Sequence, residues 1–224
     1  MADIAIINRS TVAVEWVLAQ MVPALQAQID HDFYPFWGTR ATLHFVNKDC
    51  QPDPAHWQCW IMDHSDKDGD LGYHVDPNGV PTAKVFAAED ANYGSLLSVT
   101  ISHELLEMLA DPSADRTFQL GEATYIVEVA DPVEADNDGY NIDGIRVSNF
   151  ATPRYFGMQN PAQDPRYDLR GLLKAGIPTL RPGGYCMFNS GGVWHSTMAR
   201  HLDGTLGHRA TRIHGRSRFR STGA

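Results

Sequence analysis

The sequence predicts an α+β fold: a mixed, twisted sheet with an N-terminal helix and a second, buried helix, followed by an irregular lobe rich in β-hairpins. Three observations support this prediction. The first half contains short runs of β-branched and aromatic residues bounded by turn formers. Two longer runs place apolar residues at helical spacing. The second half consists of short strand-like runs separated by Pro and Gly.

The chain is expected to divide into three parts. Residues 1–112 would form the sheet and the second helix, residues 113–206 the irregular lobe that completes a cleft, and residues 207–224 a basic, flexible tail. The 224 residues, 43% of them hydrophobic, are enough for one large domain with a real core. From Arg209 onward the tail has five Arg and no acid, so it is read as a solvated terminus, with binding of phosphate or an acidic partner as the alternative.

The first elements are a strand and a helix. The run "IAIINR" (4–9) is typical of a strand, and Ser10 is a suitable N-cap for the amphipathic run over residues 11–29. Pro23 lies inside this run and is expected to disturb the helix.

Four candidate strands follow, because each run is rich in β-branched or aromatic residues and is bounded by turn formers. The last two are joined by "DPNG", which predicts neighbouring antiparallel strands. The four runs are residues 41–47, 57–63, 71–75 and 81–89.

The second helix is predicted within "NYGSLLSVTISHELLEMLADP" (92–112), whose apolar residues recur at helical spacing. It must end near Asp111, because Pro112 disfavours helical geometry in the residue before it. Strand-like runs then follow in the irregular lobe, at residues 117–120, 124–134 and 139–150 and within 180–195.

Charge and cysteine content exclude several classes. The net charge of −9 argues against nucleic acid and anionic membranes as partners. Cys50, Cys59 and Cys186 are widely spaced and odd in number, which argues against both a disulfide framework and a thiolate zinc site. No basic lead precedes an apolar run at the N-terminus, and no run reaches the roughly 18 apolar residues of a membrane span. We therefore expect a cytoplasmic protein.

The segment "SHELLEMLADP" contains the candidate metal site. On a helix His103 and Glu107 lie on one face one turn apart, so both can bind one cation, while Glu104 points to the neighbouring position. In HExxH metallohydrolases two His bind zinc and the intervening Glu is the general base. A Glu replaces the second His here, so Mn or Ca stays possible beside Zn²⁺. Solvated acids are the alternative, but the surrounding run is nearly uncharged and should be buried, where carboxylates need compensation.

A third ligand is expected from "YIVEVADPVE". Asp131 is the favoured candidate and Glu128 the second. Along an extended strand these two side chains face opposite sides, so only one should reach the metal unless the Asp-Pro turn redirects the chain. Alternatively, Asp131 only caps the turn beside Pro132.

A resemblance supports this interpretation. The segments "LGYH", "GVPTAKVF", "SHELLEMLADP", "EVADPVE" and "VSNFATPRYF" resemble a zincin-like metallopeptidase family of uncharacterised bacterial and phage proteins. The similarity covers most of residues 40–190 and is strongest from Leu71 to Phe156; the chain departs from the zincin pattern in having HExxE instead of HExxH. The resemblance implies a zincin-like fold, with "AKVFA" (83–87) as an edge strand that binds a peptide substrate by strand addition.

These observations predict a metal-dependent peptidase acting on a peptide or protein, with a Zn²⁺-activated water and Glu104 as general base. The alternative is a non-catalytic, metal-stabilised structural or phage-assembly-associated module. Other side chains are weaker candidates, for which core packing or surface exposure is the preferred interpretation. They are His74 and His195, which could approach the cleft, and Tyr140, Tyr155 and Tyr185 as oxyanion donors.

Overall fold

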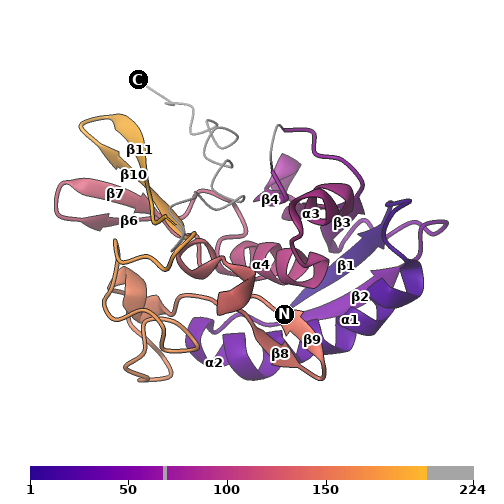
Figure 1. The fold of residues 1–224 in the computed structure, drawn as a ribbon, viewed down its shortest axis with the longest axis horizontal. Helices are drawn as coiled ribbons and strands as arrows, with labels where there is room; N and C mark the ends of the chain where they lie inside the picture. Colours follow the sequence, from indigo (N-terminus) through magenta and orange to yellow (C-terminus); the bar gives the residue numbers. More distant parts are fainter. Residues whose placement is uncertain (68–69, 201–224) are drawn as a thin grey trace.

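A computed structural model describes residues 1–67 and 70–200 and has a mixed α+β fold (Figure 1). The predicted basic tail, residues 207–224, lies outside the described residues. Two sheets lie on either side of a central helix, and a small two-stranded hairpin completes the fold. One continuous hydrophobic core contains side chains from residues 1–112 and from the following lobe.

The larger sheet has five strands in the order β2-β1-β3-β5-β4. All four strands predicted after the first helix are present, and β4 pairs with β5 in antiparallel register as the turn signal predicts. The remaining neighbours are parallel. The strands are β1 (Ala2–Asn8), β2 (Ala41–Val46), β3 (Trp57–Met62), β4 (Gly72–Val75) and β5 (Thr82–Phe86).

The predicted edge strand is wrong. The segment "AKVFA" belongs to β5, which is hydrogen bonded to β3 on one side and to β4 on the other. Among the described residues β4 pairs only with β5, so β4 is the edge. After β3 the chain first forms β4 at the edge of the sheet. It then turns back through the hairpin and forms β5, which lies between β3 and β4. Strand β5 also ends at Phe86, earlier than predicted, because helix α3 (Ala87–Tyr93) begins there.

The first helix, α1 (Glu15–Ala27), begins later than predicted. Ser10 is not its N-cap; the Ser10 Oγ accepts hydrogen bonds from the backbone N–H groups of Val12 and Ala13 and donates one to Asp63. These contacts hold the chain in a turn before the helix. Pro23 lies inside α1 without ending it. A π-helical turn, η1 (Gln28–Phe33), and helix α2 (Tyr34–Trp37) continue the same run.

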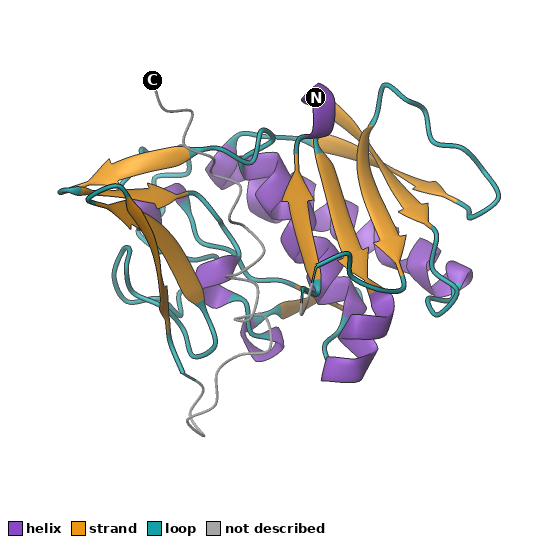
Figure 2. Cartoon of the chain, turned by 90° about the horizontal axis from the view of Figure 1, so that it is seen from above, coloured by secondary structure: helices purple, strands orange, loops and turns teal. Residues whose placement is uncertain are grey.

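The second predicted helix is α4 (Leu97–Ala110), and it ends at Asp111 as expected. Every residue from Ser98 to Ala110 is buried, because β4 and β5 cover one side of the helix and the second lobe covers the other. Helices α1 and α4 pack against the same face of the five-stranded sheet through one core (Figure 2). The structure therefore places the HExxE segment in the centre of the molecule.

The second lobe contains a four-stranded sheet in the order β11-β10-β7-β6 and the hairpin β8-β9. The predicted strand 124–134 is too long: β7 ends at Ile126, and the chain continues through a loop into the 3₁₀ turn η3 (Asp131–Val133). The strands are β6 (Thr117–Leu120), β7 (Ala123–Ile126), β8 (Tyr140–Ile142), β9 (Ile145–Val147), β10 (Tyr185–Ser190) and β11 (Val193–Met198). The other 3₁₀ turns are η2 (Pro77–Gly79), η4 (Asp136–Asp138) and η5 (Pro153–Phe156).

All three cysteines are free, in agreement with the sequence prediction. Within the part of the chain that the structure describes, no helix combines the length and the apolar character that crossing a membrane requires.

Candidate metal centre

Helix α4 carries three ionisable side chains that are completely buried: His103, Glu104 and Glu107, each with 0% exposure. A helix buried on all sides normally carries apolar residues, because an ionised group without compensation is costly in the interior. The arrangement around these three side chains therefore decides what the helix can do.

His103, Glu107 and Asp131 form the first group. The Nε2 atom of His103 lies 3.1 Å from Oε1 of Glu107 and 3.1 Å from Oδ1 of Asp131. One possible ligand atom from each of the three residues lies within 4.8 Å of the other two. Asp131 reaches this position because the chain leaves β7 and turns at the Asp-Pro step that begins η3. The alternative in which Asp131 only caps the turn is wrong, because the turn has no side-chain cap hydrogen bond and the Asp131 carboxylate contacts His103.

Glu128 does not join this group. It lies near His74 of β4, with 4.0 Å between Oε2 of Glu128 and Nδ1 of His74. The Nδ1 atom of His74 is also 3.7 Å from Oε2 of Glu107. A second group is therefore formed by His74, Glu107 and Glu128, whose possible ligand atoms also lie within 4.8 Å of one another. Glu107 belongs to both groups, and each of its two oxygens faces a different histidine.

His74 is the residue that sequence reasoning undervalued. We expected core packing or exposure for it, whereas its side chain is fully buried beside two carboxylates. No signal in the sequence indicated this position, because it depends on how β4 packs against α4. Gly72 of β4 lies against Glu104 of α4, and residues two apart on a strand share a face, so His74 also faces the helix.

Glu104 packs against the edge strand. A Cβ atom on Gly72 would lie only 2.8 Å from Oε1 of Glu104 and 2.9 Å from the carbonyl oxygen of Lys84. The glycine therefore permits the close approach of α4 to β4. Among the described residues, Glu104 belongs to neither candidate ligand group. Its carboxylate lies beside the edge strand, and Glu104 is next to His103 in the sequence.

Replacing Gly72 with Ala should destabilise the protein by about 1–3 kcal/mol, because the backbone carbonyl of Lys84 cannot move aside cheaply. In a strand without such a contact, replacing glycine with alanine normally stabilises the protein by about 0.5–1 kcal/mol. A loss of stability would therefore indicate the close contact, and a gain would indicate its absence. Urea unfolding measures it. In a Glu104→Ala background the loss should shrink but persist, because the contact with Lys84 remains. An unchanged or higher stability would contradict the close packing described here.

The charges of the first group shift the pKa values of two of its members. Burial lowers the pKa of His103, but the charge of Glu107 and the hydrogen bond with Asp131 outweigh burial and raise that pKa to about 9. Burial and the charge of Glu107 raise the pKa of Asp131 well above its usual value. His103 therefore holds a proton at neutral pH in the absence of a metal, and a bound cation would displace it.

The residue types fit a divalent cation. Imidazole and carboxylate are both accepted ligands of Zn²⁺, and the carboxylates also suit Mn²⁺. The donors converge from a helix, a strand and a turn that are packed in one core, which gives a preformed site.

The other candidates lie elsewhere. Tyr140 donates its hydroxyl hydrogen bond to Asp32, and Tyr155 donates to the carbonyl of Thr179. His195 is exposed on β11 and stacks on Phe188. Tyr185 is buried in β10 and belongs to neither ligand group. These positions do not place the four side chains at the candidate metal centre.

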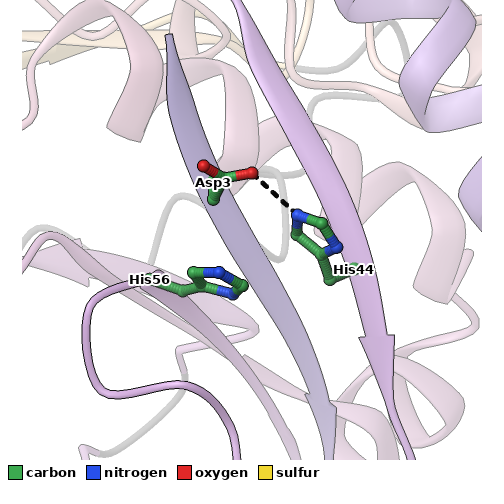
Figure 3. Close-up of side chains that lie close together, drawn as sticks. All are labelled: Asp3, His44 and His56. Atoms are coloured by element: carbon green, nitrogen blue, oxygen red, sulfur yellow. Dashed lines mark hydrogen bonds and ion pairs between the residues drawn. The ribbon is translucent and has the colours of Figure 1, made fainter.

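A third possible metal-binding group, which the sequence did not indicate, lies at the surface (Figure 3). Asp3 of β1 accepts a hydrogen bond at 2.8 Å from Nε2 of His44 on β2, and His44 stacks on His56, with 4.7 Å between ring centroids. Asp3 alternates with the core residue Ile4, so this group faces away from α1 and α4. It is partly exposed and separate from the buried centre.

Comparisons of this chain with protein-family models, with curated proteins and with solved structures found no match. The residues and their geometry are therefore the basis for assigning a function.

Proposed function

We propose that the protein is a metal-dependent hydrolase, a zincin-like peptidase, whose metal is held by His103, Glu107 and Asp131. The single observation that supports this most is the convergence of the three buried donor atoms, with both carboxylates 3.1 Å from the His103 nitrogen. A bound divalent cation would supply Lewis acidity and lower the pKa of a water ligand. Three protein ligands leave a coordination position open for that water.

The chain itself would supply the proton transfers. Glu104 is adjacent to His103 and is not needed as a ligand, so its carboxylate is available to accept the proton of the nucleophilic water and to return it to the leaving amine. In support of this role, the Glu104 side chain lies against Gly72 of the edge strand β4. An extended peptide that pairs with the edge strand by backbone hydrogen bonds would thus lie next to Glu104.

A second candidate function is a purely structural metal site. Burial favours it, because the side chains of His103 and Glu107 have no exposed surface, that of Asp131 has 1% and that of Glu128 has 8%. A structural metal contributes directly to folding free energy, whereas a catalytic metal can be removed with a smaller effect on the fold. Chelation therefore distinguishes the two functions.

We expect treatment of the full chain with a chelator to abolish hydrolysis of a denatured, fluorescently labelled protein while circular dichroism at 25 °C stays native. Adding Zn²⁺ or Mn²⁺ should restore the activity. The protein should be purified without a metal-affinity column, and elemental analysis should give its metal content beforehand. Unfolding on chelation, with no hydrolysis by the metal-loaded protein, would instead support the structural module. Hydrolysis that survives complete removal of metal would refute the metal-dependent mechanism.

A further inference from the structure

We propose that the centre holds two divalent cations bridged by Glu107. The first would bind His103, Oε1 of Glu107 and Asp131; the second would bind His74, Oε2 of Glu107 and Glu128. This inference deepens the proposed function and rests on it for the first ion, and it identifies the second group as a metal site of its own.

The distances in the second group are those of ligands around an ion. His74 Nδ1 lies 3.7 Å from Glu107 and 4.0 Å from Glu128, beyond the range of a hydrogen bond. Two ligand atoms that are each about 2.1 Å from a tetrahedral metal lie about 3.4 Å apart. The second group is therefore slightly expanded relative to a loaded site, and small side-chain movements would close it around a cation.

His74 supplies an independent observation. Neither of its ring nitrogens forms a hydrogen bond with another described residue, and its side chain has 0% exposure. A buried polar atom without a hydrogen bond costs about 1–3 kcal/mol, so such atoms in a native protein usually indicate a missing partner. A neutral imidazole nitrogen directed at two carboxylates is an accepted metal ligand. A cation between these three side chains would satisfy His74.

The position of Glu107 also suits two ions. One of its two oxygens faces the histidine of each group. A bridging carboxylate such as Glu107 is also how two ions are held about 3.5–4 Å apart in two-metal hydrolases.

The second ion would have a defined place in the proposed reaction. His74 belongs to the edge strand β4, and Glu128 is the ligand of the second group that reaches solvent. The second ion would therefore lie beside the edge strand, on the side of the centre where Glu128 reaches solvent. A cation held there would supply Lewis acidity next to the edge strand.

The stoichiometry of Zn²⁺ binding tests the proposal. The full chain should carry His44→Ala and His56→Ala, which remove the surface group, and the metal-free protein should be titrated with Zn²⁺ alone by calorimetry and equilibrium dialysis. We expect two ions per chain. Adding His74→Ala should reduce the number to one, and adding Glu128→Gln should weaken the second equivalent by at least about 10-fold. His64→Ala, a change at an exposed histidine, should leave two ions bound.

The contrary outcomes are distinct. One ion per chain that is insensitive to His74→Ala but lost with His103→Ala would overturn the second site and leave the proposed hydrolase intact. One ion that is lost with either substitution would mean a single ion shared by both histidines, which also overturns the proposal. No bound ion would refute the two-ion centre and the proposed function together.

A spectroscopic readout covers the case in which His74→Ala fails to fold. At two equivalents of Mn²⁺ the His44→Ala, His56→Ala protein should show the electron paramagnetic resonance signal of an exchange-coupled pair, because one carboxylate bridges the ions. Glu128→Gln, a conservative change at a side chain with 8% exposure, should replace it with the signal of isolated Mn²⁺. Isolated-ion signals in both proteins at full loading would overturn the bridged centre.

Discussion

Replacing Glu104 with Gln is expected to lower the rate of peptide hydrolysis by about 10²- to 10⁴-fold while leaving the metal content unchanged. Gln has the shape of Glu, so it preserves the packing against Gly72, but its amide cannot accept the proton of the nucleophilic water. Because Glu104 lies outside both ligand groups, its loss should not affect Zn²⁺ affinity strongly. Rates on a denatured, labelled protein and elemental analysis of the same samples measure the two effects.

Glu122→Gln is the matched control for this experiment. Glu122 is exposed in the turn between β6 and β7, so the same chemical change there should alter neither rate nor metal content. A Glu104→Gln variant as active as the wild type would eliminate Glu104 as the base. A variant that lost its metal together with its activity would make Glu104 a ligand, in conflict with its position beside the edge strand.

Replacing Glu107 with Gln is expected to remove metal binding from the whole centre, lowering the affinity for Zn²⁺ by more than about 100-fold. Glu107 is the residue common to both ligand groups, and a Gln amide cannot bind two cations through two oxygens. At a free Zn²⁺ concentration of about 100 times Kd, a bound ion stabilises the fold by about 2.7 kcal/mol. The variant should lose this stabilisation, so its Tm should no longer rise when Zn²⁺ is added.

The metal-free Glu107→Gln protein should also show a lower His103 pKa than the wild type, because the Glu107 charge is the strongest influence that raises it. Histidine titration by nuclear magnetic resonance measures this change. Glu134→Gln is the control, since Glu134 is another buried acid near Asp131 but belongs to neither group. That variant should keep the response of Tm to Zn²⁺. An unchanged response in Glu107→Gln would contradict the shared-ligand geometry.

The sequence by itself determined the local elements. Runs rich in β-branched and aromatic residues predicted β1 to β5, helical apolar spacing predicted α4, and Pro112 correctly marked the end of α4. These features depend on residues close together in the chain, where backbone preferences and side-chain periodicity act directly. The proximity of His103 to Glu107 was predictable for the same reason, because residues four apart on a helix share a face.

Tertiary structure alone decided which distant residues meet at the centre. The sequence suggested Asp131 and Glu128 as alternative ligands of one ion, judged as neighbours on an extended strand. Strand β7 instead ends at Ile126, and the following loop directs Asp131 to His103 and Glu128 to His74. A loop has no periodicity from which side-chain directions can be read.

The place of β4 in the sheet was also a tertiary outcome. Whether β4 or β5 forms the edge depends on hydrogen bonding between strands far apart in sequence, and a hairpin signal is the same in both arrangements. Only the edge position of β4, packed against α4 through Gly72, brings His74 to Glu107. Spacing in the chain carries no information about this contact, because it is set by packing and strand order.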